Sequence, residues 1–235
     1  MTTQTNHHPS QDLLKTFSEG QLSTGMSIAI SAHLDYCSSC RQSVEVYESE
    51  LASEWVATDP GADGPQLSES NILMDRITSQ PQVVPITQAT RPRRPVELHM
   101  HERSVRLPGV LSRVAEKGVV WKKLAGGINT AKLTLDRDAQ CDFMYMKPGS
   151  QAPRHTHRGL EVTLVLDGTF EDELGEYRPG DFVLRESTQV HTPRSDEGCL
   201  CYSVLDSPLL FTSGWSRLLN PFQRLLFNRQ LRHSH

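Results

Sequence analysis

The sequence predicts an α+β protein made of two modules, an N-terminal bundle of helices and a C-terminal β-barrel. Within residues 10–56, apolar side chains recur at helical spacing. From about residue 105 the texture changes to short runs of β-branched and aromatic residues, separated by glycine and proline. A proline-rich stretch lies between the two regions and indicates the boundary.

Three helical segments are expected at about residues 13–19, 23–35 and 37–55. Each places its apolar side chains mainly three or four residues apart, on one face. These side chains are Leu13, Leu14 and Phe17 in the first segment, Met26, Ile30 and Leu34 in the second, and Val44, Tyr47, Leu51 and Trp55 in the third. Gly20 ends the first segment, and the run DPGADGP at residues 59–65 ends the third.

A short fourth helix should follow, capped by Ser68 or Ser70 and made amphipathic by side chains between Ile72 and Ile77. Residues 80–95, QPQVVPITQATRPRRP, contain four prolines and no helical period, which favours an extended linker. We therefore divide the chain into a helical domain at 1–79, a linker at 80–97, a barrel at 98–214 and a C-terminal tail at 215–235.

The barrel is expected from six short runs at regular spacing, separated by turn residues, a pattern typical of a sandwich or small barrel. The runs are GVVWKKLAGG, AKLTLDR, DFMYMKPG, LEVTLVLDG, GDFVLRES and CLCYSVLD. The tail, which begins near Trp215 and is rich in leucine and arginine, is expected to form one last helix.

Composition excludes several classes of protein. The formal net charge of the 235 residues is -4, so the basic footprint of a protein that binds DNA directly is missing. No apolar run approaches the ~20 residues of a membrane span, and the polar start MTTQTNHHPSQD does not resemble a signal peptide. We therefore expect a cytoplasmic protein, in which the five cysteines do not form a disulfide framework and the clustered ones favour metal or redox roles.

The first candidate site is His33-x3-Cys37-x2-Cys40, where two thiolates at a helix start and one imidazole can meet the same ion. Thiolate and imidazole ligands together favour tetrahedral zinc. The fourth ligand is expected from the N-terminal segment, with His8 as the first choice and His7 as the alternative. Such an ion would hold together three helices that bury little apolar surface among themselves.

The second candidate site is Gly149-x5-His155-x-His157-x3-Glu161-x6-Gly168, followed by Gly180-Asp181 and then His191. Residues 155, 157 and 161 share parity, so on an extended strand they would point to one face, the interior of the barrel. His191 would come from another strand. Three imidazoles and one carboxylate suit zinc, iron, manganese or nickel.

Other cysteines and histidines have less specific patterns. Cys199 and Cys201 share one face of a strand, where a small apolar core role is favoured over a redox role. His99 and His101 lack a nearby carboxylate or cysteine and are interpreted as solvated. Neither a Ser-His-Asp arrangement nor a phosphate-binding glycine loop competes with the two metal sites.

The two sites resemble the signatures of known families. Residues 149–168 resemble the first motif of the cupins, and Gly180 and His191 stand at the spacing of the second, although Glu186, Thr188 and Ser195 replace its usual proline, glycine and asparagine. The helical-domain site resembles the zinc-binding anti-sigma signature. Together, in this order, the modules resemble ChrR-type anti-sigma factors over nearly the whole chain, most closely in HTHRGLEVTLVLDGTF at 155–170.

This resemblance implies a cupin barrel (a double-stranded β-helix or jelly roll) behind a zinc-stapled helical domain. It makes His8, His33, Cys37 and Cys40 the ligands of zinc, and His155, His157, Glu161 and His191 the ligands of zinc or another divalent transition metal. It also implies that the helical domain inhibits an extracytoplasmic-function sigma factor and releases it after an oxidative signal, such as singlet oxygen or organic peroxide, sensed with the cupin.

We expect apolar side chains of the helices to contact the sigma factor, since amphipathic helices bind grooves through anchors at positions i, i+3 and i+4. These side chains are Leu13, Phe17, Met26, Ile30, Ile72, Leu73 and Ile77. A non-enzymatic regulator is therefore predicted, with no direct contact to nucleic acid or membrane. The alternative is a metal-dependent cupin oxygenase or isomerase whose helices form an oligomerisation module.

Overall fold

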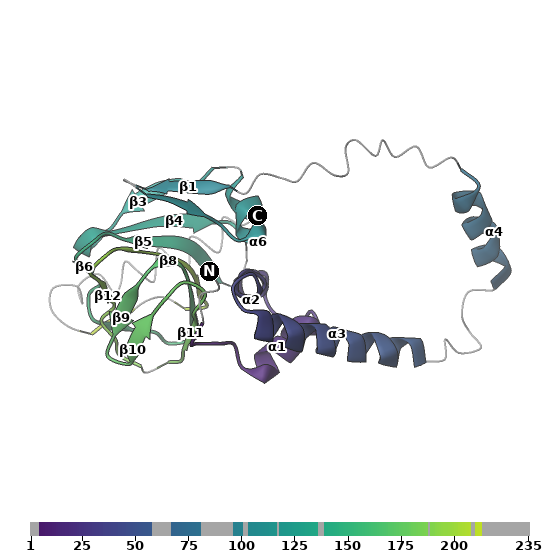
Figure 1. The fold of residues 1–235 in the computed structure, drawn as a ribbon, viewed down its shortest axis with the longest axis horizontal. Coiled ribbons are helices and arrows are strands. Elements are labelled where there is room, and N and C mark those ends of the chain that lie inside the picture. Colours follow the sequence, from purple (N-terminus) through teal and green to yellow (C-terminus); the bar gives the residue numbers. More distant parts are fainter. Residues whose placement is uncertain are drawn as a thin grey trace. The chain divides into compact units, whose positions relative to one another are not determined.

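The computed structural model describes residues 5–57, 67–80, 96–100, 103–116, 118–135, 139–187, 189–207 and 210–212 (Figure 1). It contains the predicted α+β combination, with helices at the N-terminus and sheets of a barrel after residue 96. Two compact units are distinguished, one formed by residues 1–47 and 95–235 and the other by residues 48–94. The expected C-terminal helix at 215–235 lies outside the described residues.

The four predicted N-terminal helices are present: α1 (Gln11–Ser18), α2 (Thr24–Leu34), α3 (Ser38–Ala57) and α4 (Leu67–Thr78). Serines begin the first two helices, because the side chains of Ser10 and Ser23 accept hydrogen bonds from otherwise unpaired backbone N–H groups of Leu13 and Met26. Within α3, Val44 is buried, whereas Trp55 is 84% exposed.

The barrel is built around a six-stranded sheet in the order β11-β8-β13-β5-β4-β3 and a four-stranded sheet in the order β10-β9-β12-β6. The larger sheet comprises β3 (Trp121–Lys123), β4 (Ile128–Leu133), β5 (Gln140–Met146), β8 (Glu161–Gly168), β11 (Phe182–Arg185) and β13 (Cys199–Leu205). The smaller comprises β6 (Ser150–Gln151), β9 (Phe170–Asp172), β10 (Gly175–Tyr177) and β12 (Arg194–Ser195). All pairings within these sheets are antiparallel.

Smaller elements complete the described fold. Two short pairs lie beside the main sheets, β1 (Glu97–Met100) with β2 (Arg103–Arg106) and β7 (His155–Thr156) with β14 (Leu210–Phe211). The helix α6 (Gly109–Ala115) and the 3-10 turn η1 (Ala125–Gly127) precede the larger sheet. Helix α6 was not expected from the sequence, because its seven residues are too few to display a helical period.

Alternation along the strands separates two apolar clusters. The larger cluster joins one face of the six-stranded sheet, including Leu164 and Tyr202, to helix residues such as Leu14 and Ile30. The smaller cluster contains Val165, Tyr177, Cys199 and Cys201. Helix α2 contacts strands β8, β11 and β13 and helix α6, so the first two helices and the barrel share one core.

The N-terminal segment and the barrel are also joined by hydrogen bonds. The N–H of Phe182 on the edge strand β11 donates to the carbonyl of His7 at 3.0 Å, and the hydroxyl of Tyr36 donates to the carbonyl of Leu166 at 3.2 Å. The N–H of Gly109, at the start of α6, donates to Asp35 at 2.9 Å. The segment that precedes α1 and the turn after α2 are therefore fixed to the barrel.

The second unit, residues 48–94, contains the C-terminal half of α3 and helix α4. Apolar side chains of α4 are solvent-exposed: Ile72 is 68% exposed, Leu73 57%, Met74 64% and Ile77 50%. The proposed linker at 80–97 lies almost wholly outside the described residues, so the division of the chain at that stretch stays a prediction. Among the described helices, none is both long enough and apolar enough to span a bilayer.

Candidate metal centres

The structure brings His8, His33, Cys37 and Cys40 together at the junction of the N-terminal segment, the end of α2 and the start of α3. One ligand atom from each lies within 4.8 Å of the others. Nδ1 of His8 is 3.4 Å from Sγ of Cys37 and 3.5 Å from Sγ of Cys40. These separations match the edges of about 3.6 Å expected for a tetrahedron with Zn–S near ~2.3 Å and Zn–N near ~2.0 Å.

Local structure explains why these side chains converge. Helix α2 ends at Leu34, and the turn at 35–37 leads into α3, so His33 lies one turn before Cys37. The backbone N–H of Cys40 points at Sγ of Cys37, 3.4 Å away. Nδ1 of His8 contacts both thiols, whereas Nδ1 of His7 lies 3.3 Å from Oδ2 of Asp181. The structure therefore places His8, and not His7, at this site.

The protonation of this cluster suits a cation. Burial lowers the pKa of His33, which keeps its imidazole neutral, the form that binds metals. Its Nδ1 lies 2.7 Å from the carbonyl oxygen of Gly180, while its buried Nε2 has no hydrogen-bond partner. Although burial opposes ionisation, hydrogen bonds from Ser39 and from the N–H of Cys40 bring the pKa of Cys37 down to about 6.

The second thiol behaves differently in the metal-free site. Burial, together with the neighbouring Cys37, raises the pKa of Cys40 to about 12. Two adjacent thiolates repel each other unless a cation lies between them. An unpaired imidazole nitrogen that faces two close thiols therefore fits a soft divalent ion such as zinc.

The second cluster joins His155, His157, Glu161 and His191 inside the barrel, and all four are buried. Oε2 of Glu161 lies 2.7 Å from Nε2 of His157 and 3.6 Å from Nε2 of His191. Ring centroids of His155 and His191 are 4.3 Å apart. As in the first cluster, the four ligand atoms lie within 4.8 Å of one another.

Two segments supply these ligands, and the sequence argument from strand parity was wrong in its detail. His155 begins β7, which ends at Thr156, and Glu161 begins β8, which belongs to a different sheet. His157 therefore lies in the connection, where parity does not apply. His191 forms a two-way backbone bridge with His155, with N···O distances of 3.0 and 3.1 Å, which brings the fourth ligand alongside.

Electrostatics favour a cation at this cluster as well. Burial lowers the pKa of His155 to about 4 and also lowers that of His191, so both rings are neutral near pH 7. Burial alone would raise the pKa of Glu161, but His157 and the other two imidazoles bring it down to about 2. The cluster thus presents one carboxylate and the neutral imidazoles of His155 and His191 to a common point.

Unpaired nitrogens support the same fit. Nε2 of His157 lies 2.7 Å from Oε2 of Glu161 but without hydrogen-bond geometry, and Nδ1 of His157 and Nδ1 of His191 have no hydrogen-bond partner. Nδ1 of His155 lies 2.7 Å from the carbonyl of Pro153, an outer contact that directs Nε2 towards the cluster. Buried polar atoms normally find partners, so these nitrogens and the carboxylate fit a divalent transition metal.

Neither cluster contains Cys199, Cys201 or His99. Cys199 and Cys201 are buried in the smaller apolar cluster with Sγ atoms 3.3 Å apart. His99 is exposed on β1 and contacts Ser104, while His101 lies outside the described residues. Among the expected partner contacts of the first two helices, Leu13, Phe17 and Met26 are partly buried and Ile30 is fully buried.

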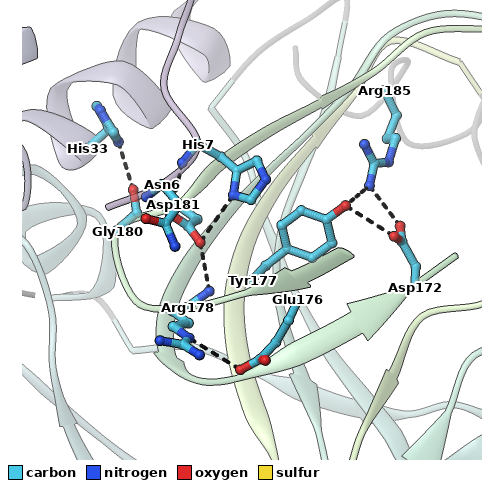
Figure 2. Close-up of polar contacts among 10 residues, drawn as sticks. All are labelled: Asn6, His7, His33, Asp172, Glu176, Tyr177, Arg178, Gly180, Asp181 and Arg185. Carbon is cyan, nitrogen blue, oxygen red and sulfur yellow. Dashed lines mark hydrogen bonds and ion pairs between the residues drawn. The ribbon is translucent and has the colours of Figure 1, made fainter. Parts of the chain in front are cut away.

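Sequence reasoning missed the contribution of the turn between β10 and β11 to the first cluster. Gly180 accepts from His33, and Asp181 holds the backbone of the segment that carries His8 (Figure 2). The sequence shows Gly180-Asp181 only as part of a barrel motif. No local pattern could link it to a cluster about 150 residues earlier in the chain.

Known proteins resemble this chain over most of its length. Residues 112–207 match the model of the ChrR Cupin-like domain family. The anti-sigma-E factor ChrR of Cereibacter sphaeroides is 32% identical over 223 residues, covering 93% of this chain and 98% of that protein. A crystal structure of Rhodobacter sphaeroides SigE in complex with the anti-sigma ChrR matches with a TM-score of 0.66 and 26% identity, covering 86% of this chain and 99% of the matched chain.

Proposed function

The chain belongs to the ChrR family of anti-sigma factors, and on that premise we propose that it binds and inhibits an extracytoplasmic-function sigma factor. The observation that carries this proposal is the 32% identity to ChrR over 93% of the chain, which spans both modules. The structural match to ChrR in its complex with SigE supports the same class of partner. Family membership also favours a regulator over an enzyme, and we propose that the chain acts in the cytoplasm, where sigma factors act.

We propose that the first cluster holds zinc through His8, His33, Cys37 and Cys40. Bound there, zinc supplies a structural cross-link between the N-terminal segment and two helices. The support is the donor chemistry: two thiols, the imidazole of His8 and the buried imidazole of His33, whose Nε2 is unpaired, offer ligand atoms within 4.8 Å of one another. The cross-link would fix the orientation of α1, α2 and α3, and hence the surface offered to the sigma factor.

We propose that apolar side chains of the helices contact the sigma factor. Leu13, Phe17 and Met26 are only partly buried, so each retains some accessible apolar area. In α4, Ile72, Leu73 and Ile77 are at least 50% exposed and lie on a helix that can occupy a groove. Ile30 is fully buried under this packing and would contact a partner only after α2 separates from the barrel.

The second cluster is proposed to hold zinc or another divalent transition metal and to take part in sensing an oxidative signal. Three imidazoles and a carboxylate bind such ions and leave room for an additional small ligand. For release, the signal must change the relative free energies of sigma-bound and sigma-free states. The chain's own residues supply a physical route, since β11 pairs with the Glu161 end of β8 and also holds the His7 backbone.

Affinity capture of the tagged chain from its own cells, followed by mass spectrometry, tests the class of function. We expect a sigma factor to be recovered with the wild type. Cys37→Ala should lose it, while Cys141→Ala, a buried cysteine of β5 outside both clusters, should retain it. Recovery of no sigma factor with a folded, metal-loaded wild-type protein would contradict the proposal.

Sensing is tested separately with variants of the second cluster in a sigma-dependent reporter strain. His155→Ala and Glu161→Ala should still inhibit the reporter but should no longer respond to singlet oxygen or organic peroxide. His99→Ala, an exposed histidine of β1, is the matched control and should respond normally. Normal induction in both cluster variants would remove the barrel metal from the response.

A further inference from the structure

The turn Arg178–Asp181 of the barrel contacts the first metal cluster from outside (Figure 2). Nδ1 of His33 lies 2.7 Å from the carbonyl oxygen of Gly180, and both groups are buried. This nitrogen donates to the carbonyl when the ring is neutral and Nε2 is the ligand atom. A contact of this kind sets the tautomer and orientation of a metal-binding imidazole.

Asp181 of the same turn holds the segment that carries His8. Its Oδ1 accepts hydrogen bonds from the backbone N–H groups of Asn6 at 2.7 Å and His7 at 3.1 Å, and its Oδ2 accepts from Arg178 N–H at 2.9 Å. The carboxylate is fully buried, and these bonds overcome the opposing effect of burial to lower its pKa. One barrel side chain thus fixes the backbone immediately before His8.

The approach at Gly180 is close enough to exclude any side chain. Its φ of +95° is unfavourable for other residues, and an added Cβ would clash with Thr5 and lie 2.8 Å from Cβ of Tyr36. Both neighbours belong to the segments that carry the ligands, Thr5 before His8 and Tyr36 directly before Cys37. The turn therefore packs against both the segment that carries His8 and the segment that carries Cys37.

We propose that the barrel supplies the outer coordination shell of the thiolate-containing site, so that this site reaches its full metal affinity only while the turn Arg178–Asp181 is docked against it. Gly180 and Asp181 are positioning residues in this arrangement. Coupling between two binding events is reciprocal, so metal binding at the first site also strengthens docking of the barrel. The inference rests on the proposed zinc site and adds the barrel as a determinant of its affinity.

This arrangement gives the barrel a way to influence the helices without contacting the sigma factor. His7 lies against Tyr177 with ring centroids 4.8 Å apart, and the hydroxyl of Tyr177 contacts Asp172 and Arg185 (Figure 2). Arg185 pairs across the sheet with Glu161, a ligand of the second cluster. A displacement of β11 or of the Tyr177 side chain would move the turn Arg178–Asp181. That movement would lower the metal affinity of the first site.

The test compares Gly180→Ala with Gly149→Ala in the full-length protein. Gly149 is the matched control, because it has a similar positive φ of +72° in the same barrel but nothing within 4 Å of an added Cβ. Cobalt(II) is the probe, since only the first site contains thiolates and so only it yields a sulfur-to-cobalt charge-transfer band. Titration against a competing chelator gives the affinity, and circular dichroism checks the fold.

We expect Gly180→Ala to weaken cobalt binding at the first site by about 10-fold or more, the effect typical of lost outer-shell partners, and Gly149→Ala to leave it unchanged. Equal affinities in the two folded variants would overturn the inference. A wild-type protein without any charge-transfer band would instead refute the zinc site on which the inference rests.

If Gly180→Ala does not fold, the cobalt affinity of Asp181→Asn is measured instead. Glu176→Gln is its control, because it alters an exposed carboxylate beside the same turn. Loss of cobalt affinity in Asp181→Asn alone supports the proposal. Equal affinity in Asp181→Asn and Glu176→Gln overturns it.

Discussion

Replacing Asp172 with asparagine should destabilise the barrel strongly, because it leaves a nearly buried guanidinium without its counter-ion. The side chain of Asp172 is 1% exposed and that of Arg185 is 11% exposed, with Oδ2 2.8 Å from Nη2. The carboxylate also accepts from the Tyr177 hydroxyl at 3.0 Å and from the Leu174 N–H at 2.9 Å. Asparagine can keep some of these hydrogen bonds but not the charge.

The expected loss is about 3–5 kcal/mol of unfolding free energy, the range for removing one partner of a buried ion pair. Glu176→Gln provides the comparison, since it breaks an ion pair with Arg178 at 3.2 Å whose side chains are 51% and 58% exposed. An exposed pair is screened by water, so that variant should lose about 0–1 kcal/mol. The two substitutions make the same chemical class of change on neighbouring strands.

Urea denaturation of the two metal-loaded variants and the wild type, followed by circular dichroism, measures both values. A change in midpoint at constant slope reports a change in stability. The reasoning about burial would be refuted if the unfolding free energies of Asp172→Asn and Glu176→Gln differed by less than about 1 kcal/mol. That result would mean that leaving the Arg185 guanidinium without a counter-ion costs no more than breaking an exposed ion pair.

Three further predictions concern the core and the metal clusters. Leu14→Ala, at a fully buried position of α1, should lower the unfolding free energy by about 2–5 kcal/mol in urea denaturation, whereas Leu174→Ala, 61% exposed, should change it little. Glu161→Gln should reduce the metal content at the second cluster, measured by elemental analysis, without reducing the sulfur-to-cobalt band of the first; loss of both would contradict two independent sites. The metal-free chain should lose up to about 3 kcal/mol as pH falls from about 6.5 to 4, because His155 has a pKa of about 4 when folded and binds a proton at higher pH when unfolded. His155→Gln should flatten this dependence, and an unchanged pH profile would contradict it.

Much of the fold could be predicted because its signals are local. The four N-terminal helices follow from apolar spacing and from breakers such as Gly20 and the DPGADGP run, and the barrel from short strands separated by turns. Helix α6 was missed because seven residues show no clear period. The exposure of Trp55 also could not be foreseen, since periodicity identifies a face but not what covers it.

The ligand residues were identified by side-chain chemistry and spacing, and the structure brings both sets of four together. The choice between His7 and His8 could be made only from the structure. Nδ1 of His7 lies beside Asp181, whereas Nδ1 of His8 faces the thiol of Cys37. The sequence argument placed His157 on a strand together with His155 and Glu161. In the structure His157 lies in the connection that follows Thr156, so strand alternation does not explain its position. Long-range contacts of this type leave no trace in local sequence.

The packing of α2 on the barrel could not be predicted from the composition of either module. Ala29 and Ile30 are fully buried against sheet residues such as Leu164 and Tyr202. An amphipathic helix face is equally suited to a neighbouring sheet or to a partner protein. For this reason the sequence assigned Ile30 to the sigma-binding surface, a role that stays a proposal.

The most direct test of the central claim is inhibition of sigma-dependent transcription by the purified chain in a reconstituted assay with core RNA polymerase. The account predicts that the zinc-loaded wild type and Cys141→Ala abolish transcription from the sigma-dependent promoter near one equivalent of protein, and that Cys37→Ala does not. Equal inhibition by Cys37→Ala would show that the first cluster is not needed to hold the sigma factor. Failure of the zinc-loaded wild type to inhibit would contradict the anti-sigma function itself.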